Sequence, residues 1–259
     1  MISNKRHQVN YFNKLNYPMF FYSNHKTYGN VSVDFGVCKL MCRRNGSYKA
    51  KACTGCYSAR LMNVYPAMAA KLRRADRVVK RVNIDKFEED ILLLKANGIK
   101  KLRVYAFGDY APSHLPLIKV IDKHLEVFVL SKTLACFYKK DFAKLSRVLK
   151  NGHISISTNS SFGQSFITKC MKYIRKHRLK NVQLNYCFFN DDYKKIAGID
   201  VYHTTKKDKH ALAKVVGTHR TCCMRGHDGK LLKEKGDAFC EKCGLCGNTK
   251  ELKKGMVTI

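Results

Sequence analysis

The chain has 259 residues, enough for one sizeable α/β domain or for a domain with a small additional module. Hydrophobic residues make up 45% of it and aromatic residues 11%, a composition that excludes a disordered tail. Its 50 Lys and Arg against 19 Asp and Glu give a formal net charge of +31, which favours a polyanionic partner. Nucleic acid is the first expectation, with an acidic membrane surface and an acidic host protein as weaker alternatives and solubility alone as the simplest explanation.

The N-terminal residues contain no apolar stretch of the kind found in secretory signals. No run of about 18 apolar residues occurs, so a membrane span is not expected. We therefore expect a cytoplasmic protein, and in that compartment structural disulfides are rare. Its 12 cysteines, where they cluster, are then expected to bind metal or to act in redox chemistry.

Three segments are expected along the chain. Residues 1–30 are polar and aromatic, which predicts an irregular basic arm. Residues 31–215 alternate between strand and helix patterns, which predicts an α/β domain with a parallel sheet and right-handed crossovers. Residues 216–259 combine cysteines and glycine turns without alternation, which predicts a small metal-held module.

Within the α/β segment, the pattern begins with a strand over 28–36, followed by a helix after Cys56. The apolar face of that helix is predicted to hold Leu61, Val64, Met68 and Leu72. A second helix is predicted from an N-cap at Asp85 to Gly98. Further strands are predicted over 101–109, 126–131, 153–158, 182–188 and 200–204, and further helices over 113–124, 138–151 and 165–180. Five or six such units predict a partial βα barrel or an open, doubly wound parallel sheet.

The surest metal site in the sequence is the C-terminal run Cys240, Cys243 and Cys246. Cysteines three positions apart place their sulfurs on one side of a tight turn, and Cys222 or Cys223 can supply a fourth thiolate. Four thiolates can hold a cubane iron–sulfur cluster or a tetrahedral zinc ion. The overlapping C-x2-C steps favour the cluster, because zinc ribbons more often pair two separated steps.

An earlier group of cysteines follows the first predicted strand: Cys38, Cys42, Cys53 and Cys56. Four thiolates here would make a closed zinc site or a closed cluster, whereas three would leave one iron open to a substrate or cofactor. One or two metal centres are therefore expected, and the spacing leaves zinc and iron–sulfur open.

Two predicted helices carry basic faces with few acidic residues, whereas exposed helix faces usually mix both signs. Their spread over several elements suits sequence-independent phosphate contact with DNA or RNA. The Tyr and Phe residues among the basic stretches allow stacking on single strands. The predicted nucleic-acid-binding residues are Lys71, Arg73, Arg74, Arg77, Lys80, Arg81, Lys169, Lys172, Arg175, Lys176, Arg178 and Lys180.

Three motifs, in this order along residues 30–250, together resemble known proteins. Cys53-Thr-Gly-Cys56-Tyr57-Ser58-Ala59, opening a helix, resembles the cysteine–cysteine–Tyr–Ala element of radical S-adenosylmethionine enzymes and their phage relatives. Arg103-Val-Tyr-Ala-Phe-Gly108-Asp109-Tyr110 resembles the strand ending in Ser-Gly-Asp-Phe of the phage gene-product-eighty-eight family. The run from Cys240 to Cys246 resembles the C-terminal cysteine run of that family.

The resemblance implies a phage-encoded protein of the host cytoplasm, with a partial βα barrel and one or two 4Fe-4S clusters. In radical enzymes, the open iron of the cluster and a turn after the second strand hold S-adenosylmethionine. By position, the resemblance implies Asp109 as a catalytic residue and Gly108, Asp109, Ser157 and Asn159 as cofactor contacts. The chain departs from the pattern in the ten residues between Cys42 and Cys53 and in the Phe-Gly-Asp turn, which lacks a second glycine and has Asp in place of Glu.

The sequence leaves three functional hypotheses. The first is an iron–sulfur protein of radical-enzyme-like fold that binds nucleic acid in an accessory or regulatory role. The second is an active radical S-adenosylmethionine enzyme that modifies a nucleic acid or nucleotide. The third is a zinc-stabilised nucleic-acid-binding protein that is not an enzyme.

Overall fold

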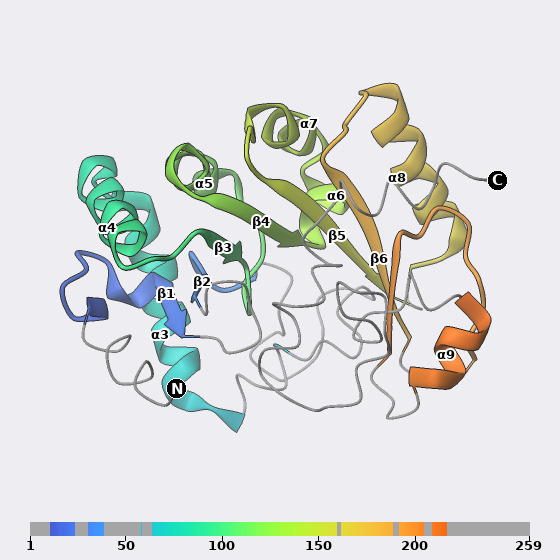
Figure 1. Cartoon of the computed structure of the whole chain (residues 1–259), viewed down its shortest axis with the longest axis horizontal. Coiled ribbons are helices and arrows are strands. Elements are labelled where there is room, and N and C mark those ends of the chain that lie inside the picture. The colour runs from blue at the N-terminus through green and yellow to red at the C-terminus, as the bar shows by residue number, and fades with distance from the viewer. Residues whose placement is uncertain are drawn as a thin grey trace.

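The computed structural model describes residues 11–23, 31–38, 58, 64–159, 162–188, 192–204 and 209–216. Within them, seven strands form one sheet in the order β1-β2-β3-β4-β5-β6-β7 (Figure 1). The first strand, β1 (Phe21–Ser23), pairs antiparallel with β2 (Val31–Val33), and every later neighbour pair is parallel. The predicted α/β class with a mostly parallel sheet is confirmed.

The remaining strands are β3 (Lys101–Val104), β4 (Glu126–Ser131), β5 (His153–Asn159), β6 (Val182–Phe188) and β7 (Val201–Thr204). The helices are α3 (Pro66–Val78), α4 (Ile84–Ala96), α5 (Leu115–His124), α6 (Thr133–Phe137), α7 (Lys139–Val148), α8 (Gln164–Lys176) and α9 (Lys209–Val216). Short 3-10 turns lie at η1 (Pro18–Phe20), η4 (Val79–Arg81) and η5 (Pro112–His114). None of the described helices is long and apolar enough to cross a membrane.

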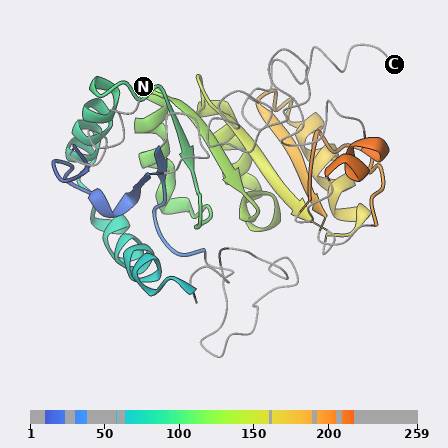
Figure 2. The ribbon, with the colours of Figure 1, turned by 60° about the horizontal axis from the view of Figure 1, so that its bottom comes forward.

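The parallel strands lie side by side in their sequence order, so every crossover moves in the same direction along the sheet. Right-handed crossovers that all move in one direction place their helices on one face. Figures 1 and 2 show α4, α5, α7 and α8 in a row on that face. The described sheet therefore has no reversal of strand order of the kind that marks a doubly wound fold.

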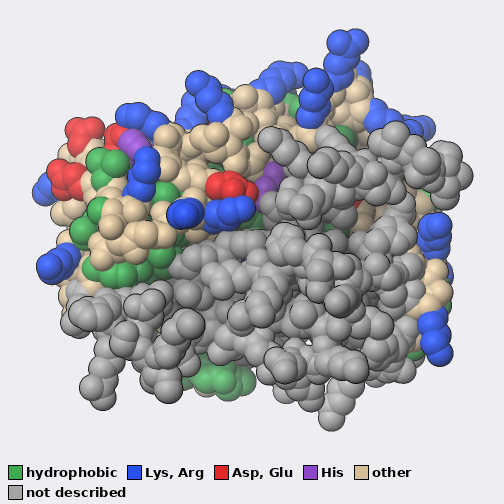
Figure 3. All heavy atoms as spheres, viewed as in Figure 1, with side chains coloured by type: hydrophobic (Ala, Val, Ile, Leu, Met, Phe, Trp, Pro, Cys, Tyr) green, Lys and Arg blue, Asp and Glu red, His purple; other side chains and the backbone are tan. Residues whose placement is uncertain are grey.

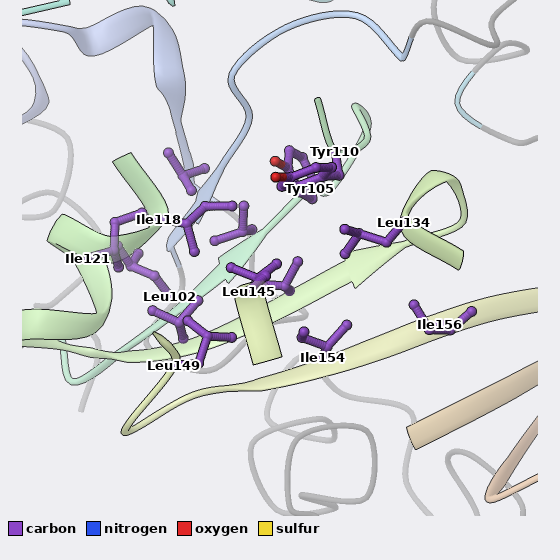
Figure 4. Packing of buried hydrophobic residues seen from close by; sticks show 14 of the residues in the cluster. Leu102, Tyr105, Tyr110, Ile118, Ile121, Leu134, Leu145, Leu149, Ile154 and Ile156 are labelled. Atoms are coloured by element: carbon purple, nitrogen blue, oxygen red, sulfur yellow. The ribbon is translucent and has the colours of Figure 1, made fainter. Parts of the chain in front are cut away.

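The hydrophobic core fills the space between these helices and the sheet (Figure 4). Side chains alternate between the two faces of a strand, and one set on each strand is apolar and buried. Ile154 and Ile156 of β5 and Leu102 of β3 belong to this core, together with the helix residues Ile118 and Leu145. This alternation leaves the other face of the sheet to a different set of side chains.

The prediction of an irregular arm over residues 1–30 is corrected within residues 11–23. Tyr11, Leu15, Phe20 and Phe21 are buried there, and β1 extends the sheet at its antiparallel edge. Phe20 and Phe21 both contact the ring of Phe87 in α4, with centroid distances of 6.1 Å. Aromatic burial therefore orders a segment whose polar composition predicted a loop.

Helix boundaries differ from the predictions for local reasons. Pro66 occupies the first turn of α3, a position that favours proline, so Val64 precedes the helix and is 57% exposed. The buried face of α3 is formed by Ala69, Leu72 and Ala75. The N-cap of α4 is Asn83, whose side chain accepts the Lys86 N–H, so the prediction of Asp85 as the cap is corrected.

The predicted strand over 101–109 ends early, at Val104. The next residue, Tyr105, has a φ of 71°, which is incompatible with a continued strand. The helices α6 and α9 were not predicted as separate elements. The predicted cysteine module at 216–259 lies, apart from Val216, outside the described residues.

Candidate functional site

The carboxyl ends of the parallel strands meet at one edge of the sheet, where ligands of α/β proteins usually bind. At this edge, Asp34 follows β2, residues 105–110 follow β3, and Lys132 and Thr133 follow β4. Two buried carboxylates, Asp34 and Asp109, connect these segments. The geometry of the edge can therefore be built from what each of them binds.

The Asp34 carboxylate is fully buried and accepts backbone hydrogen bonds from three successive residues of the loop after β3. Gly108 N donates at 2.7 Å, Phe107 N at 3.1 Å and Ala106 N at 3.2 Å. Burial raises the pKa of Asp34 to about 7, against the opposing effects of these N–H donors and of the Arg103 charge. Asp34 thus fixes the loop that carries the predicted cofactor residues Gly108 and Asp109, although Asp34 itself is not among the predicted site residues.

Gly108 lies where the loop after β3 meets the loop after β2. A Cβ atom at this position would lie 2.3 Å from the carbonyl oxygen of Gly36 and 3.0 Å from Asp34 Oδ1. Only glycine fits against this backbone without displacing it. The structure therefore gives Gly108 a packing role, and its predicted cofactor contact stays a prediction.

Asp109 was predicted as the catalytic residue, and its carboxylate lies 7% exposed. It accepts hydrogen bonds from Ser131 Oγ at 2.5 Å, Thr133 Oγ1 at 2.8 Å and the N–H of Lys132 at 3.0 Å. Burial raises its pKa, while the bonds from Ser131, Tyr110, Lys132 and Thr133 oppose that shift. In this arrangement Asp109 joins the loop after β3 to the start of α6, and its catalytic role stays a prediction.

A buried hydrogen bond between Tyr105 and His114 lies beside this loop. The Tyr105 hydroxyl lies 2.8 Å from His114 Nδ1, which also accepts the Ala111 N–H at 3.2 Å. The positive φ of Tyr105 turns the chain out of β3 at this point. His114 therefore positions the residues on both sides of Asp109.

The predicted cofactor residues Ser157 and Asn159 lie near the end of β5, on the face opposite Ile154 and Ile156. Ser157 pairs with Asn185 of β6, which lies on the same face. In the described part of the chain, Ser155 Oγ and Asn185 Oδ1 are buried without a hydrogen-bond partner. A buried unsatisfied polar atom costs free energy, so this face has the capacity to bind a polar group.

Ser155 and Asn185 are not among the residues predicted from the sequence, although the sequence contains a signal for them. Polar and apolar residues alternate in HISIS (153–157) and in VQLNY (182–186). Such alternation in a strand buried on both faces indicates a polar inner face. Arg103 of β3 lies on the same face, since it pairs with Phe128 of β4, which in turn pairs with His153 of β5.

Of the predicted metal ligands, the structure describes Cys38 alone, a half-buried residue five positions after the end of β2. Cys42, Cys53, Cys56, Cys222, Cys223, Cys240, Cys243 and Cys246 lie outside the described residues. Among the residues that are described, no three His, Cys, Asp or Glu side chains gather as a metal site. The metal centres therefore stay predictions.

The basic residues predicted on two helices form two separate surfaces. Helix α3 lies near β1 and β2 and α8 near the opposite end of the sheet (Figures 1 and 2). Exposed side chains on and after α3 are Arg73, Arg74, Arg77, Lys80 and Arg81. Exposed side chains on and after α8 are Lys169, Lys172, Arg175, Lys176, Arg178 and Lys180.

Lys71 differs from the other predicted nucleic-acid-binding residues because its ammonium group turns inward. Nζ donates to the Phe21 carbonyl at 2.6 Å and lies 4.2 Å from the centroid of the Tyr22 ring. Burial lowers the pKa of Lys71, and the charge of Asp34 opposes the shift. These contacts join α3 to β1.

The α8 surface continues onto α7, which the sequence analysis did not include. Between Tyr138 and Asn181 the chain has eleven Lys and Arg residues and one acidic residue, Asp141, a net charge of +10. All eleven basic side chains are exposed. Figure 3 shows Lys and Arg side chains along the edge formed by α7 and α8, with acidic side chains gathered over α4.

No protein-family model, no curated protein and no solved structure matches the chain. The resemblance to radical enzymes and to the gene-product-eighty-eight family therefore stays a prediction.

The close approach at Gly108 predicts a large cost for a methyl group. Gly108→Ala should lower the free energy of unfolding by about 1–3 kcal/mol, because its Cβ would overlap the Gly36 carbonyl. Gly163→Ala is the control: a Cβ there meets nothing within 4 Å, and the loss of glycine at the N-cap of α8 should cost less than about 1 kcal/mol. Equal urea midpoints for the two variants would contradict the described packing.

The raised pKa of Asp34 predicts a specific pH dependence of stability. The unfolded chain releases the Asp34 proton near pH 4, whereas the folded protein holds it up to about pH 7. The contribution of this proton to stability is therefore fully present below pH 4 and is lost as pH rises to 7. Urea unfolding can be measured from about pH 4.5 to about pH 7.5, which spans this window. The free energy of unfolding of the wild type should fall with rising pH relative to that of Asp34→Asn.

The control for that measurement is Asp85→Asn, which removes a carboxylate at an exposed position of α4. A constant difference between wild type and Asp34→Asn across the pH range would show that Asp34 is already ionised in the folded protein at pH 4.5.

Proposed function

We propose that this chain is an iron–sulfur protein that binds nucleic acid through the outer helices of a radical-enzyme-like α/β domain. The observation that carries the nucleic-acid part is the surface of α7 and α8, with eleven exposed cations and one acidic residue. Such a field attracts phosphates without reading base sequence. This binding suits an accessory or regulatory role, and the motif resemblance supports a phage origin.

The strand order supports the radical-enzyme-like part of the proposal. A sheet of consecutive parallel strands with helices on one face is the arrangement of a partial βα barrel. The group from Cys38 to Cys56 follows the first parallel strand, β2, and Gly108 and Asp109 follow the second, β3. This is the order in which radical enzymes place a cluster-binding loop and a cofactor-binding turn.

The cysteine spacing supports an iron–sulfur cluster over zinc, as argued from the overlapping C-x2-C steps. If a cluster is present, its thiolates would come from Cys240, Cys243, Cys246 and a cysteine at 222 or 223, with a second centre at 38–56. A zinc-stabilised protein that is not an enzyme is the alternative for the same ligands.

An active radical S-adenosylmethionine enzyme is the second candidate function. The polar inner face of β5 and β6 favours it, because Ser155 and Asn185 present buried polar atoms that lack partners within the described residues. Ser157 and Asn159 lie on the same face, closer to the carboxyl edge. When bound, S-adenosylmethionine would supply a radical, and these residues would hold its polar groups.

Metal content separates these candidates. After anaerobic purification we expect iron and acid-labile sulfide, with the broad visible absorption of thiolate-bound iron. Cys243→Ala should lose the metal centre of the C-terminal cysteine group. The control is Cys170→Ala, which changes a buried cysteine outside the predicted ligand groups. Stoichiometric zinc without iron would support the third hypothesis, and reductive cleavage of S-adenosylmethionine would support the enzyme.

Nucleic-acid binding should be strong at low salt and should weaken steeply as salt rises. Changing Lys169, Lys172, Arg175 and Lys176 to Gln should reduce the affinity at least about tenfold at about 0.1 M salt. The slope of log K against log salt should become less steep, by roughly 0.9 for each phosphate that is no longer neutralised. The control changes Lys86, Lys95, Lys100 and Lys119, which are exposed elsewhere, to Gln with the same reduction in charge. A salt-insensitive interaction, or equal weakening in both variants, would contradict the proposal.

A further inference from the structure

Helices α7 and α8 pack against each other and form one surface, which we call the α7–α8 ridge. The ring of Tyr173 in α8 stacks on Phe142 in α7, with centroids 5.7 Å apart and planes 15° apart. The Tyr173 hydroxyl also donates to the Lys139 carbonyl at 2.5 Å. The ridge comprises the exposed residues Lys139, Lys140, Lys144, Arg147, Lys150, Lys169, Lys172, Arg175, Lys176, Arg178 and Lys180.

The cations of the ridge lie in two rows, one on each helix. On α7, Lys140, Lys144 and Arg147 recur at helical spacing and therefore share a side of the helix. On α8, Lys169, Lys172 and Lys176 do the same. Each row runs along a helix that extends roughly 15–20 Å.

The ridge lacks a platform on which single-stranded bases could stack. Phe142 is buried at 1% exposure, and Tyr173 is half-buried against it. The ring of His177 lies 4.2 Å from that of Tyr173. Among the described residues of α7 and α8, no aromatic ring is exposed, although single-strand binding proteins gain about 1–3 kcal/mol from each stacked base. The sequence-based expectation of stacking therefore finds no support on this surface.

We propose that the α7–α8 ridge binds double-stranded DNA, with α7 and α8 each contacting one of the two phosphate strands. The inference rests on the proposed nucleic-acid function and names its substrate class. Two cation rows on separate helices can each face one of the two phosphate strands that flank the B-form major groove, roughly 12 Å wide. A single strand offers one row of phosphates, and duplex RNA has a deep, narrow major groove.

The two-row contact also explains why binding would be independent of sequence. Lys and Arg side chains on a ridge that meets phosphates on both strands fix the position of the duplex without reaching base edges. Asp141, the one acidic residue on α7, is half-buried and lies between Lys140 and Lys144 in the sequence.

The decisive experiment compares two variants of the full chain on three nucleic acids of equal length and mixed sequence. One variant changes Lys140, Lys144, Arg147 and Lys150 to Gln, and the other changes Lys169, Lys172, Arg175 and Lys176 to Gln. Fluorescence anisotropy measures binding to duplex DNA, single-stranded DNA and duplex RNA at fixed salt. Circular dichroism and thermal melting of each variant check that the surface changes leave the fold intact.

We expect wild type to bind duplex DNA at least about tenfold more tightly than either other nucleic acid, and each variant to bind duplex DNA at least about tenfold more weakly than wild type. The variant changed at Lys86, Lys95, Lys100 and Lys119 should bind less than about threefold more weakly. Equal affinity for single-stranded DNA, tighter binding to duplex RNA, or an unaffected α7 variant would overturn the two-row contact while leaving nucleic-acid binding in place. Absence of binding to all three nucleic acids would instead overturn the proposed function.

Discussion

The fold depends on one repeated interaction, in which a buried aspartate accepts the backbone N–H groups of a neighbouring loop. Asp34 binds residues 106–108, and Asp109 binds the turn at 132–133. Asp90 binds the N–H groups of Asn16 and Tyr17, and Asp122 binds those of Lys150 and Asn151. Burial raises the pKa of all four carboxyl groups, because removing an ionised group from water is costly.

These contacts connect segments that are far apart in the sequence. Asp34 and the loop that it binds are more than 70 residues apart, as are Asp90 and Asn16. Each carboxylate satisfies two or more backbone donors that would otherwise be buried without partners. The loops at the carboxyl edge are therefore held by side chain–backbone bonds where the strand ladder has ended.

The same interaction shapes the charge of the surface. The chain has 19 acidic residues against 50 basic ones, and four of the aspartates are buried in backbone contacts. Glu88 is engaged by Lys123 and His124 beside α4. On α7 and α8, Asp141 alone offsets the cations, so the positive field is concentrated at one end of the row of helices. A sheet with a polar inner face and cationic outer helices offers two chemically distinct surfaces.

The sequence by itself determined the class of the fold, since β4 and β6 were predicted with their observed bounds and the other parallel strands at the correct places. The alternation of strand and helix patterns and the C-x2-C spacing can be read from neighbouring residues, and the net charge can be read from the composition.

Only the tertiary structure decided which polar residues face inward, which aspartates are buried, and that α7 and α8 form one surface. Asp34 follows the end of β2, and no neighbouring residue in the sequence indicates that its side chain binds the loop after β3. The residues at 11–23 were misassigned for the same reason, because the aromatic partner that orders them, Phe87, belongs to a distant helix. Contacts between distant segments depend on the whole packing arrangement, and local patterns carry no record of it.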